Sequence, residues 1–422
     1  MIAYAEALEI LLAAASPLPA VAVAVDQAAG RALAEAVHSP QCLPPFDNAA
    51  MDGFALHSAG RPIEAGREFD VRGWQAAGDP AAAAGEGAWE IMTGARLPTG
   101  LDSVVPVEQV EILERAAQQP RRIRLGGTVA PGQFVRLRGQ DVTSGEPVLA
   151  PGTLLDINAI ALLHAIGVEQ VMVRSRPRVA VIATGKELVS DPAQALQSGQ
   201  IRDSNRPALV ARLRQAGAEV AWQGTVGDDV EAFGHALDQA VAAGARLVVS
   251  TGAVSAGRYD FIPQALRARG ARILFHKVAI RPGKPILFAC LADGTLYFGL
   301  PGNPVSTAVG QRFFVEPVLR RQLGLADEAA LMLPLQREVG TPAGLRFHAR
   351  ARIEPDGQGG LAVRVLSGQE SFRLASTLQA NAWAVLDGNG ARLPAGSLVR
   401  VHGWGHADGL QLEPGTGTRT DT

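Results

Sequence analysis

The chain has 422 residues, of which 47% are hydrophobic and 19% charged, and its formal net charge is -2. This length exceeds what one hydrophobic core usually serves, so we expect two to four domains. The composition excludes an intrinsically disordered chain, and the near-neutral charge argues against a nucleic acid or a membrane surface as partner. Only two cysteines, Cys42 and Cys290, are present, which excludes a disulfide framework and favours a reduced, cytoplasmic setting.

The chain begins with MIAYAEALEILLAAASPLPA, which predicts an amphipathic helix because Leu8, Leu11 and Leu12 recur at helical spacing. The segment lacks the basic start of a secretory signal and carries two glutamates within its apolar stretch. No uninterrupted apolar run approaches the ~18 residues that a membrane span needs. We therefore expect no membrane segment.

Residues 45–145 contain short strand-like runs, such as WEIM and RRIRL, separated by glycine and proline turns. This pattern predicts a small β-rich domain. Residues 156–168, DINAIALLHAIGV, return to helical periodicity with Asp156 as the N-cap. A helix on either side of an all-β segment indicates that the β-rich domain is inserted into another one.

From Arg178 the pattern alternates between strand and helix up to about residue 326. The continuous apolar runs VAVI and LVVS are typical of strands covered on both faces, which predicts a parallel α/β sheet. Asn205 and Asn303 each precede a proline at the start of a predicted helix, so we expect both side chains to act in capping. The remaining part of the chain, from about residue 331, has short alternating strands and predicts a small β domain, possibly a barrel.

The distribution of lysine points to an anion-binding centre. Only Lys186, Lys277 and Lys284 occur beside 36 arginines, and two of these lysines lie in HKVAIRPGKPILF. A compact ammonium kept in an arginine-rich chain indicates a position that needs a point charge, although genomic base composition is the plainer explanation for the bias itself. The following LPGNP turn passes from strand to helix, where backbone N–H groups often face an anion.

Four loops follow predicted strands and are the expected place for a ligand: TGKEL, GDD, STGAVSAGRYD and LPGNP. Thr251 and Ser255 offer hydroxyl donors, and Asp260 adds a carboxylate, which suits a phosphate ligand if Mg²⁺ bridges the two. No single loop is specific, since the chain lacks both GxxxxGK[ST] and an opening GxGxxG. The coincidence of four such loops is the informative feature.

Further polar motifs lie in the β-rich region. PPFDNAAMDGFAL contains Asp47 and Asp52, and RLRGQD places Arg136 and Arg138 on one face of a strand ahead of Asp141. Alternate arginines of this kind can clamp a phosphate or another dianion. A purely structural role in turns is the alternative for the aspartates.

Taken in order, PPFDNAAMDGFAL, IMTGARLPTG, RLRGQD, STGAVSAGRYD, HKVAIRPGKP and FGLPGNPVS resemble the MoeA family of molybdenum insertases, which includes the E domain of gephyrin. The resemblance covers nearly the whole chain and implies a multidomain α/β plus β fold. Its four expected domains are an elongated helical linker domain (1–44 and 146–176), an inserted β-rich domain (45–145), an α/β molybdopterin-binding domain with a parallel-type sheet (177–326) and a C-terminal β-barrel (327–422).

The resemblance also implies an activity: Mg²⁺-dependent hydrolysis of adenylylated molybdopterin, coupled to molybdate insertion, which yields molybdenum cofactor and AMP. The expected partners are a second copy of the chain, with the site built across the homodimer interface, and possibly a molybdopterin adenylyltransferase and molybdoenzymes. The residues implied in catalysis are Asp52, Asp141, Asp260, Lys277 and Lys284. Those implied in Mg²⁺ binding are Asp228 and Asp260. Those implied in substrate binding are Thr93, Arg136, Arg138, Thr184, Glu187, Thr251, Gly252, Ser255, Arg281, Pro301, Pro304 and Ser371.

The chain departs from the family pattern at several positions. Ala253 stands where relatives usually have a second glycine, and an added methyl there would crowd a phosphate or block a positive φ. Lys186 and Arg258 replace frequent acids. Two other functions therefore stay open: a non-catalytic protein that binds and delivers the cofactor, and a nucleotide pyrophosphatase on the same α/β domain.

Overall fold

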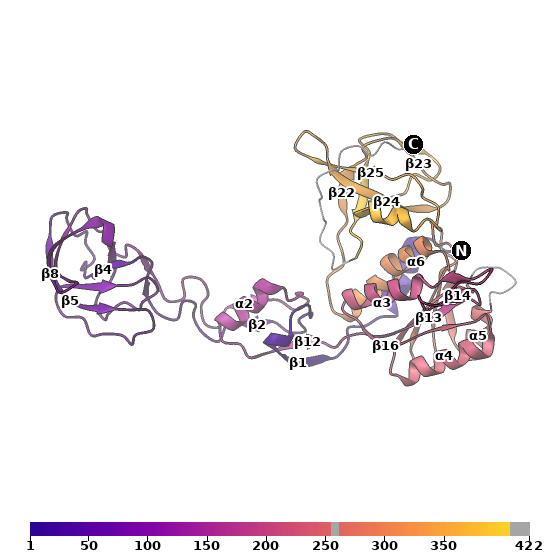
Figure 1. Cartoon of the computed structure of the whole chain (residues 1–422), viewed down its shortest axis with the longest axis horizontal. Coiled ribbons are helices and arrows are strands. Elements are labelled where there is room, and N and C mark those ends of the chain that lie inside the picture. The colour runs from indigo at the N-terminus through magenta and orange to yellow at the C-terminus, as the bar shows by residue number, and fades with distance from the viewer. Residues whose placement is uncertain (255–260, 406–422) are drawn as a thin grey trace. The chain divides into compact units, whose positions relative to one another are not determined.

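The computed structural model describes residues 1–254 and 261–405, and its contacts divide the chain into two compact units. The first unit comprises Met1–Val21, Gly30–Ala34 and the chain from Val173 onward, and the second comprises Ala22–Ala29 and Glu35–Met172. Figure 1 labels the elements of both. The grouping places residues 1–21 with the α/β region, whereas we had assigned them to the helical linker domain. The four domain boundaries given above therefore stay a proposal.

The first unit is built on a six-stranded mixed sheet in the order β16-β13-β17-β21-β20-β18. The first four strands are parallel, as expected, but β20 runs antiparallel to both of its neighbours, β21 and β18, so the sheet is mixed and the expected parallel sheet is only part of the structure. The strand bounds are β13 (Arg178–Thr184), β16 (Glu219–Val226), β17 (Leu247–Thr251), β18 (Arg272–His276), β20 (Leu287–Cys290) and β21 (Leu296–Leu300).

Helices cover both faces of this sheet, which explains the continuous apolar runs. In β13, Val179 and Val181 contact one apolar cluster, whereas Ala180 and Ile182 contact another on the opposite face. This alternation follows from the two-residue period of a strand. The helices are α3 (Asn205–Gln215), α4 (Val230–Ala242), α5 (Ile262–Ala268), α6 (Pro304–Gly310) and α7 (Glu316–Gln322), with a π-helical segment η3 (Gln311–Val315) between the last two. A two-stranded sheet pairs β14 (Leu188–Val189) with β15 (Ile201–Arg202).

The expected N-terminal helix forms as α1 (Tyr4–Ala13). Its buried Ala7 and Leu11 belong to the same apolar cluster as Phe314 and Leu319 of the helices that follow β21. Of the three leucines read as the amphipathic stripe, Leu11 faces the α/β core, whereas Leu8 and Leu12 are half-buried and line a separate pocket.

A second sheet of the first unit has the order β19-β24-β26-β28-β22, and β25 also pairs with β24. An isolated bridge joins Leu335, just after β22, to Val363 of β25. The bounds are β19 (Ile280–Arg281), β22 (Leu331–Pro334), β24 (Arg346–Pro355), β25 (Leu361–Val365), β26 (Ala382–Leu386) and β28 (Leu398–His402). A 3-10 segment η4 (Ala375–Gln379) precedes β26, and β23 (Val339–Gly340) pairs with β27 (Arg392–Leu393). Because β19 comes from the RPGKP segment, this pairing ties that segment to the C-terminal sheet.

The second unit contains a six-stranded sheet in the order β7-β4-β6-β5-β9-β8, whose core includes Phe54, Leu56 and Ile123. Its bounds are β4 (Gly53–Leu56), β5 (Glu68–Gln75), β6 (Ala88–Ile91), β7 (Ser103–Pro106), β8 (Val110–Ala116) and β9 (Gln119–Leu125). The shorter elements are β2 (Val37–His38), β3 (Asn48–Ala49), β10 (Val135–Arg136), β11 (Pro147–Leu149), α2 (Ile157–Ala165) and the 3-10 turns η1 (Val25–Gln27) and η2 (Val107–Gln109). The chain passes between units through β1 (Ala20–Ala24) and β12 (Gln170–Arg174).

Asp156 caps α2 as expected, because its carboxylate accepts a hydrogen bond from the Ala159 N–H at 2.8 Å. Within the described residues, no helix is both long and apolar enough to cross a bilayer.

Candidate functional site

The main cavity of the first unit lies where the loops after β13, β17 and β21 meet β19 and the loop before η4, and it has a volume of about 1060 Å³. This is the strand edge at which an open α/β sheet usually binds its ligand. Ten of the residues expected in the site line the cavity: Thr184, Glu187, Asp228, Thr251, Gly252, Arg281, Lys284, Pro301, Pro304 and Ser371.

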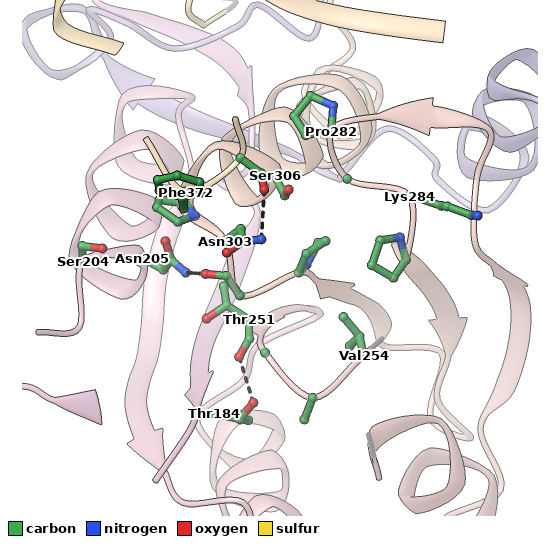
Figure 2. Close-up of a pocket in the computed structure, with 18 of the residues that line it drawn as sticks. Thr184, Ser204, Asn205, Thr251, Val254, Pro282, Lys284, Asn303, Ser306 and Phe372 are labelled. Atoms are coloured by element: carbon green, nitrogen blue, oxygen red, sulfur yellow. Dashed lines mark hydrogen bonds between the residues drawn. The ribbon is translucent and has the colours of Figure 1, made fainter. Parts of the chain in front are cut away.

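The floor of the cavity is a close approach between two loops. The Thr184 hydroxyl donates to the Thr251 carbonyl at 2.9 Å, as Figure 2 shows, and the Gly252 N–H donates to the Leu300 carbonyl at 3.0 Å. A Cβ on Gly252 would lie 2.4 Å from the Thr184 carbonyl oxygen, and the φ of Gly252 is +89°. Only glycine fits there without a shift of the backbone.

Ala253 also adopts a left-handed backbone, with φ +49°. The concern that its methyl would block a positive φ is therefore wrong. The conformation costs a non-glycine residue roughly 1–2 kcal/mol, which the surrounding loop has to offset.

The loop after β21 differs from the sequence expectation. Asn303 is the N-cap of α6, but its side chain makes no capping bond and instead donates from Nδ2 to the Ser371 hydroxyl at 2.9 Å. The Val305 N–H donates to the Ser371 carbonyl at 3.0 Å, so this first-turn donor is already satisfied by the protein. Asn205 is the first residue of α3, and its amide donates to the Gly302 carbonyl at 2.7 Å. Both asparagines therefore join loops and cap no helix with their side chains.

Five charged side chains of the cavity have no ion-pair partner among the described residues. The anions are Glu187 and Asp228, both half-buried, and the cations are Arg202, Arg281 and Lys284, all exposed. The Arg202 guanidinium donates to the backbone carbonyls of Asp191 and Gln194. The Arg281 guanidinium lies 5.5 Å from the centre of the Phe347 ring, and an Asp228 oxygen accepts from the Lys186 backbone N–H at 3.4 Å. Two further acids of the lining are already neutralised, Asp203 by Arg206 and Glu370 by Arg373.

This donor set fits Mg²⁺ bound together with a phosphate. Mg²⁺ usually takes one or two carboxylates and completes its coordination with water and substrate oxygens. Glu187 and Asp228 supply such carboxylates, and no cluster of three or more potential metal ligands occurs within the described residues. Asp260, the other expected metal ligand, lies outside the described residues, as do Ser255 and Arg258.

The wall opposite Lys284 includes Phe372, whose ring is 65% exposed (Figure 2). This wall is the segment 368–373, and the buried guanidinium of Arg350 holds it by donating to the carbonyls of Gly368, Glu370 and Arg373 at 2.6, 3.1 and 2.6 Å. Burial lowers the pKa of Arg350 from its ordinary value. The guanidinium is thus a structural clamp on the wall that carries Ser371.

Lys277 is not among the residues that line the cavity. It lies between β18 and β19 with φ +73°, its N–H donates to the Ile286 carbonyl, and its carbonyl accepts from the Ile2 N–H. The Val278 N–H donates to the Lys284 carbonyl at 2.9 Å, so the two lysines lie on adjacent segments, although only Lys284 lines the cavity. A catalytic role for Lys277 stays a prediction.

The second unit gathers three of the sequence motifs around residues 47–52. The Gly94 N–H donates to the Ala49 carbonyl, and the Ala50 N–H donates to the Phe134 carbonyl. The Asp52 carboxylate accepts from the N–H and the hydroxyl of Thr93 at 2.6 and 2.9 Å, and these bonds hold its pKa below the usual range. Asp52 is therefore an anion at neutral pH.

The other expected residues of this unit lie on the same segments. Arg136 is in β10, which pairs with β3, and the Arg138 N–H donates to the Asp47 carboxylate at 2.6 Å. The Asp141 N–H donates to the Leu43 carbonyl at 3.0 Å. The structure thus brings these motifs together with Asp52 and Thr93 within the second unit, while the cavity belongs to the first.

Sequence reasoning did not identify the site roles of Asn205, Asn303, Arg350 and Phe372. The sequence predicts helix caps at both asparagines, because a proline follows each of them at the start of a helix. Arg350 lies in a strand of alternating arginines, FHARARI, where its complete burial has no local signal. The sequence offers one indication that Phe372 belongs to the site, namely that it directly follows Ser371.

Comparison with known proteins covers nearly the whole chain. Residues 2–167 match the family described as the MoeA N-terminal region (domain I and II), residues 180–321 match a probable molybdopterin binding domain, and residues 333–404 match the MoeA C-terminal region (domain IV). A molybdopterin molybdenumtransferase of Synechococcus elongatus is 39% identical over 416 residues, which cover 95% of this chain and 99% of the relative.

A second molybdopterin molybdenumtransferase, from Staphylococcus aureus, is 32% identical over 408 residues and covers 94% of each chain. Among solved structures, the molybdopterin biosynthesis MoeA protein of Pyrococcus horikoshii has a TM-score of 0.77 and 28% identity, with 95% of this chain and 99% of that chain covered.

Proposed function

Because the chain belongs to the MoeA family of molybdopterin molybdenumtransferases, an enzyme family of molybdenum cofactor biosynthesis, we propose that it releases AMP from adenylylated molybdopterin while molybdate is inserted. The coarser activity, molybdenum insertion, follows from the family. The proposal concerns the finer chemistry: a Mg²⁺-dependent hydrolysis in which one water cleaves the phosphoanhydride and AMP leaves.

One observation carries this proposal: the main cavity combines cations that have no ion-pair partner among the described residues, Arg281 and Lys284 among them, with two unpaired carboxylates, Glu187 and Asp228. Cations alone would suit any anion, and carboxylates alone would repel a diphosphate. Both together suit a diphosphate whose charge is shared between protein cations and a divalent metal. We assign Arg281 and Lys284 to neutralise phosphate and molybdate oxygens, because preorganised cations stabilise charge that develops during the reaction.

Mg²⁺ would be held by Asp228 with Glu187, and by Asp260 if the family pattern holds for it. When bound, the metal supplies Lewis-acid polarisation of a phosphoryl oxygen. The protein's own part is to orient the diphosphate through Lys284 and Arg281 and to contact it through Thr251, which lies on the floor of the cavity.

We further propose a homodimer in which Asp52, Thr93, Arg136, Arg138 and Asp141 of one subunit complete the cavity of the other. Large apolar side chains support an interface on this part of the second unit: Met51, Met92, Phe134 and Leu137 are 40%, 39%, 39% and 56% exposed, and each lies within two positions of one of these motif residues in the sequence. Grouped exposed apolar residues usually mark an interaction surface. Asp52 within this group would then be partly desolvated on association.

The test is an assay of AMP release from adenylylated molybdopterin, with and without Mg²⁺ and molybdate. We expect release to need Mg²⁺ and to rise with molybdate. No AMP release at saturating molybdate, with the cofactor still bound, would favour the alternative of a non-catalytic delivery protein. Release from simple dinucleotides at the same rate would favour a pyrophosphatase. The main reason for the delivery alternative has weakened, because Ala253 does adopt the positive φ.

A further inference from the structure

The contacts of Ser371 with the start of α6 define the direction of its hydroxyl proton. The Asn303 Nδ2 donates to Ser371 Oγ at 2.9 Å, and the Val305 N–H donates to the Ser371 carbonyl at 3.0 Å. An amide nitrogen only donates, whereas a serine hydroxyl carries one donor and two acceptor positions. Ser371 Oγ therefore acts as the acceptor in this bond, and its own proton is available for another partner.

No acceptor for that proton occurs among the described residues, although Ser371 lines the cavity together with Arg281 and Lys284. A hydroxyl without an acceptor that faces a cavity containing free cations is suited to an incoming oxyanion. The loop that carries it is fixed independently of Asn303, because Arg350 binds the carbonyls of Gly368, Glu370 and Arg373. Removal of the Asn303 amide should then leave Ser371 in place and change only the partner to which its hydroxyl donates.

We propose that Asn303 is a positioning residue: its amide occupies an acceptor site of Ser371, so that the Ser371 hydroxyl donates to a tetrahedral oxyanion in the cavity. The proposal rests on the proposed function to the extent that molybdate is the oxyanion. It also explains why the N-cap side chain of α6 leaves its own helix uncapped. If Asn303 served only to start the helix, its substitution by another good N-cap residue would not change molybdate binding.

The distinguishing change is Asn303→Asp. A carboxylate of the same shape accepts the Ser371 proton and withdraws it from the cavity. We expect the dissociation constant for molybdate, measured by titration calorimetry on the purified full-length chain, to rise about tenfold or more, since losing one hydrogen bond to a charged group has this magnitude. A helix-start role predicts no loss, because aspartate is as good an N-cap as asparagine. The melting temperature should accordingly be unchanged or higher.

The new negative charge could itself repel molybdate, so the same change is also made in a Ser371→Ala background. If the charge alone acts, Asn303→Asp weakens molybdate binding by the same factor in both backgrounds. If Asn303 acts through the hydroxyl, the factor shrinks in the Ser371→Ala background, which is a coupling that a double-mutant cycle measures directly. Asn303→Ala should weaken binding by a smaller factor than Asn303→Asp, because it frees the hydroxyl to rotate without capturing its proton.

Equal factors in the two backgrounds, or wild-type molybdate affinity in Asn303→Asp, would overturn the role given to Asn303 and leave the proposed function intact. A wild-type chain that binds no molybdate would overturn both.

Discussion

Two consecutive residues on the floor of the cavity, Gly252 and Ala253, both have a left-handed backbone, but only the first of them requires glycine. Gly252 has no room for a Cβ, since the Thr184 carbonyl would lie 2.4 Å away. Ala253 already carries its methyl at φ +49°, so the position tolerates a side chain at an energetic cost. Packing therefore excludes any side chain at Gly252, whereas Ala253 carries its methyl group at the cost of backbone strain.

This contrast gives a matched pair of substitutions. Ala253→Gly should change the free energy of unfolding by no more than about 1 kcal/mol, because relief of backbone strain offsets the added freedom of the unfolded chain. AMP release should be retained. Gly252→Ala should lower both stability and AMP release, since the floor loop has to move away from Thr184. Urea denaturation and the AMP assay check both variants, and a Gly252→Ala protein as active as wild type would contradict the proposed role of the floor.

The lysines allow a second test at the residue scale. Lys284 lines the cavity without an acidic partner among the described residues, whereas Lys277 does not line it. Lys284→Gln should raise the Michaelis constant for molybdate or substrate roughly tenfold, which corresponds to about 1.4 kcal/mol of lost charge interaction. Lys277→Gln, the control of equal charge change, should have a smaller effect. Steady-state AMP release at varied molybdate measures both, and a larger effect at Lys277 would restore its sequence-based catalytic assignment.

At the scale of elements, the helical segment after β21 is joined to the C-terminal sheet by a buried ion network. Arg312 of η3, whose side chain is 3% exposed, pairs with Glu316 at 3.2 Å and with Glu328, and its Nε donates to the Gly403 carbonyl at 2.9 Å. Burial opposes ionisation of Glu328, but His402 at 3.7 Å and the hydrogen-bonded ion pair with Arg312 outweigh this and hold its pKa at about 2. The network therefore requires the ionised carboxylate.

Glu328→Gln should consequently destabilise the protein in a pH-dependent way. A carboxyl whose pKa falls on folding contributes its full stability above its ordinary pKa, and that stability is lost as the pH drops toward 2. We expect a loss of about 2–3 kcal/mol at pH 7 that diminishes below pH 4.5. Denaturant unfolding at pH 7, 5 and 3.5 measures it, with Asp327→Asn as the exposed neighbouring control. A difference independent of pH would mean that the variant loses packing and not charge.

At the scale of the whole molecule, the chemistry-bearing residues are divided between two compact units. The first unit holds the cavity, and the second holds Asp52 with its Thr93 bonds and the exposed apolar side chains around them. A site shared between subunits would give each unit a function that it lacks alone. A two-fold symmetric dimer of this kind would contain two equivalent shared sites.

Subunit mixing tests this arrangement. Asp52→Ala and Lys284→Gln chains are co-expressed with different tags and assayed at molybdate and substrate concentrations well below the Michaelis constants, where each variant should have low activity alone. Random pairing should restore about a quarter of wild-type AMP release, because half of the dimers are mixed and each mixed dimer has one intact site. The control is co-expression of two differently tagged Asp52→Ala chains, which should stay inactive. Purified mixed dimers without activity would show that the two residues do not act in one shared site.

The sequence by itself determined the properties that depend on local pattern. The apolar runs in β13 and β17 predicted strands that are covered on both faces, and the apolar spacing in α1 predicted a helix that packs on a core. Six motifs in order identified the family. Ten of the residues named from the sequence line the cavity. Those in the loops after strands were expected there because strands that end at the same sheet edge bring their following loops together, whereas Arg281 and Ser371 were implied by the family resemblance.

Only the tertiary structure decided which of these residues act on each other. The presence of Lys284 but not Lys277 in the cavity lining depends on how the chain passes from β18 to β19, and the turn of Asn303 away from its helix depends on Ser371, 68 residues later. Backbone period and turn chemistry are encoded over a few residues, whereas the direction of a side chain is set by whichever distant element packs against it.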